Sequence, residues 1–334
     1  MFYCLVIISA ACLYTYTKEA HFENLMIMFI LFVFLIVLFL AGMNMLRKGL
    51  ISLTFEKIEK RLLLFTDHPL KAFLVSIVFT GILQSSSAFM VIVIGFVSVG
   101  ALSFKRSIPL ILGTNIGSTF TTEFLAVKLE LLIVVLAAGG ALLLITRKSP
   151  FRHVGLSMIG LGVIFFCING FSRLAVPLSR LESGAYIVNL VEHSSFYALI
   201  IGTVLTAIIH SSSACVGILM SFMDQGVVGL TEAMSVVLGS NIGTCITAVM
   251  ASVKGGAAAR QTAYAHVVFN LIGAAAVYPA LSSITGLVAG LSASPAQQIA
   301  HFSLLFNVVT AVLFLPLTNV FHSFIMFLVP NRNR

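Results

Sequence analysis

Charged side chains are scarce in this sequence: Asp, Glu, Lys and Arg make up 9% of its 334 residues, whereas hydrophobic residues make up 59%. A soluble globular domain carries about 25% charged residues and does not need this much apolar surface. The imbalance excludes an ordinary soluble protein and predicts an integral membrane protein in the lipid bilayer. Segments of about ten residues that alternate polar and apolar, typical of membrane β-barrels, are also absent. We therefore expect an all-α, polytopic membrane protein.

The sequence also lacks features typical of proteins that bind nucleic acids, transition metals or organic cofactors. The net charge of +8 comes without a basic patch with interleaved aromatics, so we expect no nucleic-acid partner. The five cysteines lie in apolar sequence without metal-ligand spacing, which favours small buried side chains over disulfides or a transition-metal site. No pattern suggests an organic cofactor, and we expect none.

The lengths of the charge-free segments predict two kinds of membrane element. Leu25–Leu46 is long enough for one spanning helix of about 20 residues. Residues 72–104 and 193–223 are too long for one crossing and short for two, so we expect a re-entrant helical hairpin in each. Residues 53–64 read as an amphipathic interfacial helix. Residues 1–24 form an apolar segment that we interpret as a possible extra membrane helix.

Basic residues predict how these elements are oriented. If Leu25–Leu46 runs inward, all but four of the 19 Lys and Arg residues lie inside, and the exceptions are Lys18, Lys128, Arg173 and Arg180. The positive-inside rule expects this asymmetry. An odd number of crossings then separates the two hairpins, so they enter the bilayer from opposite faces.

Two short motifs occur twice in the chain. Residues 84–88 read QSSSA and residues 210–214 read HSSSA, while residues 113–117 read GTNIG and residues 239–243 read GSNIG. Both pairs have the same sequence offset, which indicates an internal duplication rather than shared composition. With opposite orientations, the copies predict the inverted-topology repeats of many secondary transporters.

The duplication defines the expected organisation of the chain. The first repeat covers residues 25–150 and the second covers residues 151–280; residues 281–334 form a C-terminal membrane helix and basic tail. Each repeat contributes a broken transmembrane helix, over residues 108–127 and 233–253, because the glycines around each Asn allow the helix to unwind.

Polar groups deep in a membrane segment point to a binding site. Consecutive serines at a hairpin tip offer hydroxyls, free backbone N–H groups and helix N-termini, which together suit an anion. Carbonyl and hydroxyl oxygens near Asn115 and Asn241 suit Na⁺. A single serine cluster is more typical of helix packing, but its duplication favours a site. For the two Asn residues, interhelical hydrogen bonding and ion binding stay equal alternatives. Glu123 is best explained as an interfacial partner of Lys128.

These twin motifs resemble the type II sodium-dependent phosphate cotransporters, and the resemblance covers most of residues 25–320. The segment after the second motif resembles the family's at Arg260, Ala263, His266, Phe269, Asn270 and Pro279.

Three features depart from the family pattern. His210 replaces a Gln, so it either binds the anion when protonated or acts as a neutral hydrogen-bond partner. Residues 134–143 are apolar where electrogenic animal members carry an Asp. The PhoU-like domain of many bacterial members is expected to be absent.

The resemblance implies a secondary active transporter that moves inorganic phosphate coupled to Na⁺, and it assigns site residues. The substrate-binding candidates are Gln84, Ser85, Ser86, Ser87, His210, Ser211, Ser212 and Ser213. The sodium-binding candidates are Gln84, Ser86, Thr114, Asn115, Ser118, Thr119, Ser212, Ser240, Asn241 and Thr244. We expect a multi-pass protein of a bacterial-type inner membrane, and a possible homodimer.

Other functions fit the sequence less well. The same architecture could carry another oxyanion or a small carboxylate, or form an anion channel. His210 beside Ser211 raises the idea of an intramembrane hydrolase, but adjacent helical residues do not face each other and no acid orients the His. We therefore predict that the protein is not an enzyme.

Overall fold

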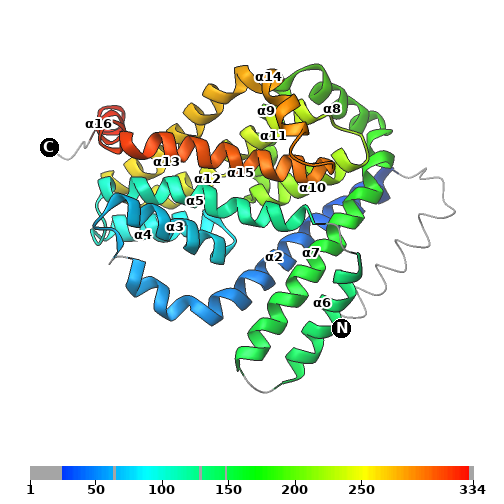
Figure 1. The fold of residues 1–334 in the computed structure, drawn as a ribbon, viewed down its shortest axis with the longest axis horizontal. Helices are drawn as coiled ribbons and strands as arrows, with labels where there is room; N and C mark the ends of the chain where they lie inside the picture. The colour runs from blue at the N-terminus through cyan, green and yellow to red at the C-terminus, as the bar shows by residue number, and fades with distance from the viewer. Residues whose placement is uncertain (1–24, 63–64, 128–129, 147–148, 331–334) are drawn as a thin grey trace.

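The computed structural model describes residues 25–62, 65–127, 130–146 and 149–330, and within these ranges every regular element is helical (Figure 1). The helices are α2 (Leu25–Leu62), α3 (Pro69–Leu83), α4 (Ser86–Ser98), α5 (Phe104–Leu125), α6 (Glu130–Ile145), α7 (Ser149–Ser179), α8 (Glu182–His193), α9 (Ser195–Ile209), α10 (Ser212–Asp224), α11 (Leu230–Gly243), α12 (Cys245–Ser252), α13 (Ala257–Val277), α14 (Leu281–Ala289), α15 (Pro295–Phe314) and α16 (Thr318–Leu328), with short 3₁₀ turns at Tyr278–Ala280 and Leu315–Leu317.

Five helical stretches are long and apolar enough to cross a membrane, which confirms the prediction of an all-α, multi-pass membrane protein. They are Ile27–Leu53, Ser149–Ser179, Leu230–Ser252, Ala257–Ala289 and Pro295–Leu328. Helix α5 is not among them because Ser, Thr and Asn side chains occupy much of its length. Most of these polar side chains are buried, and Figure 1 places α5 through the middle of the molecule, between α3–α4 and α13–α15.

The two serine triplets lie in helix–turn–helix hairpins. Helices α3 and α4 form the first, and α9 and α10 form the second. The first hairpin begins at Pro69 rather than at residue 72, because Pro69 starts the helix and His68 Nδ1 accepts a hydrogen bond from the Leu70 N–H over 3.2 Å. Lys71 is thus inside the helix, at its exposed end, where a charged group stays solvated.

One predicted element is wrong and another is more divided than expected. Helix α2 continues through Leu62, so residues 53–62 extend the first spanning helix and do not form a separate interfacial helix. Residues 281–334 contain α14 and one stretch that is long and apolar enough to cross a membrane, Pro295–Leu328, which agrees with the predicted C-terminal membrane helix. This stretch consists of α15 and α16, because Pro316 interrupts the helical path at a 3₁₀ turn. The N-terminal segment 1–24 lies outside the described residues.

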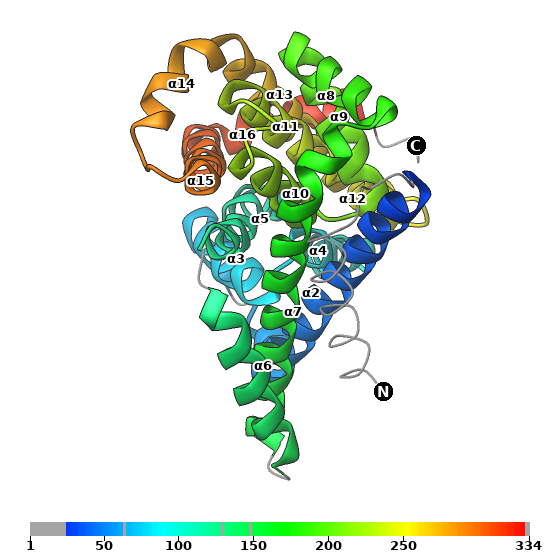
Figure 2. The same cartoon turned by 90° about the vertical axis from the view of Figure 1, so that its right-hand side faces the viewer.

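The packing joins distant parts of the chain. Helix α2 lies along α7, and α6 packs against α7; α6 and the adjoining end of α7 extend away from the rest of the molecule in Figure 2. Inside the larger apolar core, Phe171 packs against Phe32 with ring centroids 5.6 Å apart. Helix α4 packs against α12, and α10 packs against α5. The second leg of each hairpin therefore contacts the helix that follows the other hairpin.

The predicted break over residues 108–127 is wrong, because α5 is one uninterrupted helix. Its glycines serve close packing instead of unwinding. A Cβ on Gly113 would meet the Phe73 carbonyl oxygen, and a Cβ on Gly117 would lie 2.7 Å from Thr80 Cβ, so only glycine lets α5 approach α3. The matching helix over residues 233–253 is interrupted at Thr244, between α11 and α12.

The glycines of the second copy have the same neighbours. A Cβ on Gly239 would meet the Leu199 carbonyl oxygen, and one on Gly243 would meet the Thr203 carbonyl oxygen, both on α9. Each GxxxG motif thus seats its helix against the first leg of its own hairpin.

Candidate functional site

Both hairpin tips have the same backbone geometry. Gln84 and His210 adopt the left-handed conformation, with φ of 51° and 58°, and they end α3 and α9. Ser85 and Ser211 follow in extended conformation and act as N-caps: their Oγ atoms accept hydrogen bonds from the N–H groups of Ala88 and Ala214 over 3.1 and 3.2 Å. The twin sequence motif therefore encodes one structure twice.

The remaining serines of each triplet form the first turn of α4 and α10. Ser86 and Ser213 are buried, and Ser87 and Ser212 are half-buried. Their hydroxyls make no hydrogen bond within the described part of the chain. The N–H groups of a first helical turn also lack intrahelical acceptors. Each tip thus presents hydroxyl and amide donors at the positive end of a helix, which suits an anion.

The first residues of the two triplet motifs differ in their surroundings. Gln84 is buried, donates Nε2 to the Gly81 carbonyl, and accepts a hydrogen bond at Oε1 from Thr121 Oγ1 on α5 over 2.6 Å. Both ends of its amide are therefore engaged in holding the tip. His210 is exposed, and its ring forms no hydrogen bond within the described residues.

Four sodium-site candidates share one hydroxyl orientation. Ser118 and Thr119 on α5 donate to carbonyls one turn earlier, at Asn115 and Ile116, both over 2.7 Å. In the second copy Ser240 donates to Val237 O over 3.0 Å and Thr244 donates to Asn241 O over 2.7 Å. With their protons directed at backbone, these oxygens can offer lone pairs to a cation but cannot donate to an anion.

The paired Asn residues of the two copies have different partners. Asn115 Nδ2 donates to Asn270 Oδ1 on α13 over 2.7 Å, and Asn115 Oδ1 lies 3.3 Å from His266 Nε2. Asn241 Nδ2 donates to Val237 O within its own helix over 3.0 Å. Interhelical hydrogen bonding and ion binding were equal alternatives for these Asn residues, and the structure shows interhelical hydrogen bonds at Asn115. The Thr114 hydroxyl is also interhelical, 2.8 Å from Thr80 Oγ1 on α3.

Glu123 has a partner that the sequence did not indicate. Glu123 Oε1 lies 3.0 Å from His301 Nδ1 on α15, and both side chains are partly exposed. The predicted pairing with Lys128 stays a prediction, because Lys128 lies outside the described residues. His301 was missed because α15 is distant in sequence.

A cavity lies away from the hairpin tips, at the C-terminal ends of α5 and α10. Its polar lining comes from Asn169 and Ser172 on α7 together with Asp224 and Gln225. None of the predicted site residues lines it.

Comparison with known proteins identifies the family. The family model described as Na⁺/Pi-cotransporter matches residues 38–173 and, separately, residues 181–315. The chain belongs to the Na⁺/Pi-cotransporter family. The predicted resemblance is confirmed, and each matched stretch contains one of the two hairpins.

Relatives of this family member include bacterial and rat proteins. The "Uncharacterized protein YqeW" of Bacillus subtilis is 68% identical over 305 residues, which cover 91% of this chain and 99% of that protein. The "Putative inorganic phosphate export protein YjbB" of Salmonella typhimurium is 23% identical over 290 residues, covering 86% of this chain and 53% of its own. This chain therefore spans about half of that protein's length. "Sodium-dependent phosphate transport protein 2C" of Rattus norvegicus is 38% identical over 84 residues, covering 24% of this chain and 14% of its own. No solved structure is detectably similar.

Sequence reasoning overlooked Thr121 as a contact of the first tip. The signal was present, because Thr114, Ser118 and Thr121 recur at helical spacing and lie along one face of α5. The partners of Asn115 carried no comparable signal, since His266 and Asn270 come from a helix more than 150 residues later.

Proposed function

We propose that this family member is a secondary active transporter that moves inorganic phosphate together with Na⁺. Phosphate binds between the two serine triplets, at Ser85–Ser87 and Ser211–Ser213, without an organic cofactor. The observation that carries the proposal is the repeated tip geometry, in which two helix N-termini each offer unpaired hydroxyls. Neutral donors can bind an oxyanion and release it again, which a carrier requires.

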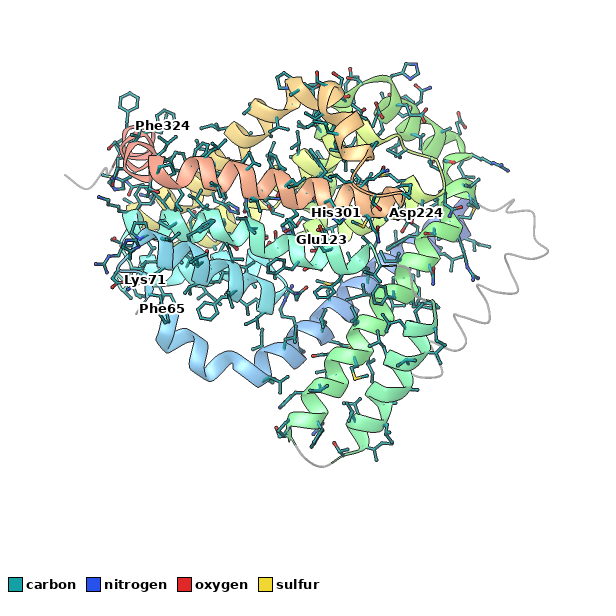
Figure 3. The ribbon with its side chains drawn as sticks, viewed as in Figure 1. Phe65, Lys71, Glu123, Asp224, His301 and Phe324 are labelled. Carbon is teal, nitrogen blue, oxygen red and sulfur yellow. The ribbon has the colours of Figure 1, made fainter. Side chains whose placement is uncertain are left out.

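The proposed site lies near the middle of the membrane, between repeats of inverted topology. Figure 3 labels Lys71, in the first turn of α3, toward one side of the molecule and Asp224, the last residue of α10, toward the other. Hairpins that open toward opposite sides and end between them support re-entrant elements from the two membrane faces. The two tips are the ends of α3 and α10 farthest from these labelled residues.

Na⁺ binds beside the phosphate, at oxygens of α5 and the α11–α12 junction. The hydroxyls of Ser118, Thr119, Ser240 and Thr244 direct their protons to backbone and leave lone pairs available. The serines at the tips therefore act as hydrogen-bond donors to the anion, and these four hydroxyls act as oxygen ligands of the cation. Gln84 contributes by holding its tip in place.

The name of one relative gives a direction of net transport. YjbB is named for phosphate export, while the rat relative is named for sodium-dependent phosphate transport without a direction. The match to YjbB extends over far more of this chain, which favours export as a second candidate function. A Na⁺ symporter exports phosphate only when the sum of the Na⁺ and phosphate gradients is directed outward. The direction of net transport therefore depends on the number of Na⁺ ions coupled to each phosphate.

Purified protein in proteoliposomes tests the proposal. An inward Na⁺ gradient should drive saturable ³²P-phosphate accumulation, and an equal K⁺ gradient should not. Competition by arsenate and succinate distinguishes phosphate from another oxyanion or a small carboxylate. Flux that neither saturates nor depends on Na⁺ would indicate an anion channel, and absence of phosphate flux in either direction would reject the substrate. A bacterial inner-membrane location and a homodimer also belong to this proposal, and membrane fractionation and crosslinking test them.

A further inference from the structure

Three side chains and one backbone carbonyl form a closed ring of hydrogen bonds in the interior. Asn270 Nδ2 donates to His266 O over 2.9 Å, Asn115 Nδ2 donates to Asn270 Oδ1 over 2.7 Å, and His266 Nε2 lies 3.3 Å from Asn115 Oδ1. All three residues are at most 3% exposed. The ring connects the GTNIG motif of α5 to α13, whereas Gly113, Thr114 and Gly117 of the same motif contact α3.

The direction of every hydrogen bond in the ring follows from one atom. The His266 carbonyl can only accept, so Asn270 must present Nδ2 to it and Oδ1 to Asn115. Asn115 then presents Nδ2 to Asn270 and Oδ1 to His266. Because Oδ1 also only accepts, His266 carries a proton on Nε2. Its Nδ1 is buried without a partner in the described part of the chain, which fits the neutral ring.

The second copy joins this network through a different residue. Within the described residues Asn241, at the position matching Asn115, bonds to Val237 O of its own helix and is 8% exposed. Cys245, which follows the second motif, accepts a hydrogen bond at Sγ from Asn270 Nδ2 over 3.2 Å, and its Sγ lies 3.5 Å from His266 O and from Asn241 O. The Asn side chain of the motif therefore takes part in the network in the first copy only, among the residues that the structure describes.

Helix α5 is thus held from two sides at the level of Asn115. Gly113 and Gly117 seat it against α3, and Thr114 bonds to Thr80 on the same helix. The ring fixes the opposite side to α13. Ser118 and Thr119, whose lone pairs we assign to Na⁺, follow within the next turn, so their placement depends on both attachments.

We propose that His266 and Asn270 are positioning residues, which orient the Asn115 side chain and thereby set the sodium-binding oxygens of α5. This inference rests on the proposed Na⁺ coupling. Under this proposal, residues of α13 change the apparent affinity for Na⁺ through Asn115, although they contact neither phosphate nor Na⁺ themselves.

A matched pair of substitutions at one position tests it. His266→Gln places an amide N–H near the location of Nε2, whereas His266→Asn places one near Nδ1 and cannot reach Asn115. In proteoliposomes, the Gln variant should keep the half-saturating Na⁺ concentration within about twofold of wild type, and the Asn variant should raise it about fivefold. Adding His266→Asn to Asn115→Ala should cause no further increase, because both remove the same bond.

Thr310→Val provides a control, since this buried hydroxyl donates only to carbonyls of its own helix. Equal Na⁺ dependence of the Gln and Asn variants, or additive effects with Asn115→Ala, would overturn the proposal. If His266→Asn is not recovered from membranes, Asn270→Ala takes its place in the same comparison.

A second measurement separates this inference from the proposed function. Thermal unfolding in detergent should give the Gln variant a midpoint near wild type and lower that of the Asn variant by about 3 °C, again without additivity to Asn115→Ala. If wild-type protein shows no Na⁺-dependent phosphate flux, the proposed function fails and the role in Na⁺ binding fails with it. The unfolding data then report on the ring alone.

Discussion

The Thr121 hydroxyl on α5 donates to Gln84 Oε1 at the tip of the first hairpin over 2.6 Å. The equivalent residue of the second copy, Thr247, donates instead to Thr244 O in its own helix over 2.9 Å. Gln84, which precedes the first serine triplet, is therefore attached to the following long helix by a side-chain hydrogen bond, whereas His210, which precedes the second, has no such bond within the described residues.

Thr121→Val tests the importance of this attachment. The substitution keeps the side-chain volume but leaves Gln84 Oε1 buried without its donor, so the tip should lose its fixed position. We expect the phosphate concentration for half-maximal transport to rise about fivefold. Thr247→Val is the matched control and should change it less than twofold. Equal effects of the two variants would show that the bond to Gln84 has no special role.

Ser86→Ala and Ser212→Ala test the proposed phosphate site. Each removes one unpaired hydroxyl from the first turn of α4 or α10, so Na⁺-driven phosphate accumulation should be abolished while the protein still folds. Radiolabelled uptake and size-exclusion profiles measure the two properties. Ser98→Ala, at the exposed end of α4 where the hydroxyl bonds to Ile94 O, should transport normally. Wild-type uptake by both tip variants would contradict the site.

Gly113→Ala tests the close approach of α5 to α3. The added methyl group would collide with the Phe73 carbonyl oxygen, and relieving the overlap should cost about 1–3 kcal/mol. Gly95 on α4 has no atom within 4 Å of an added Cβ, so Gly95→Ala should leave stability unchanged or raise it by about 0.5–1 kcal/mol. Unfolding in detergent measures both variants. An unchanged stability of Gly113→Ala would mean that α3 and α5 can move apart without destabilising the protein.

A double-mutant cycle tests the pair formed by Glu123 and His301. The atoms are 3.0 Å apart and the side chains are 26% and 37% exposed, so Glu123→Ala and His301→Ala should show a coupling free energy of about 0.5–1 kcal/mol. The exposed pair of Asp67 and Lys71, 3.8 Å apart, provides a reference whose coupling should be near zero. Additive effects at Glu123 and His301 would show that their contact does not stabilise the fold.

Local sequence patterns were sufficient to predict the helical hairpins and the duplicated tips. The length of a charge-free segment limits how many crossings it can make, and Ser after an apolar run is a common N-cap, so these features depend on neighbours in sequence. The first hairpin starts a few residues earlier than predicted because Lys71 lies within the helix, where its charged end remains exposed.

Features that depend on distant partners were not predictable in this way. The sequence around Asn115 would contain the same glycines whether they unwound the helix or allowed a neighbouring helix to approach. Only the position of α3 distinguishes these two roles. Likewise, the partners of Glu123 and Asn115 lie on α15 and α13, far along the chain. A single sequence does not indicate which buried polar groups meet.

The glycine contacts described above also restrict how the protein can move. A hairpin leg that rests on glycines at Gly113 and Gly117 cannot slide along α5 by one turn without driving side chains into backbone, and the same holds for α9 on α11 at Gly239 and Gly243. Each leg and its long helix must therefore travel as one rigid body. Relative movement of these units is then left to their other contacts, which include those of α4 with α12, of α10 with α5 and of α5 with α15.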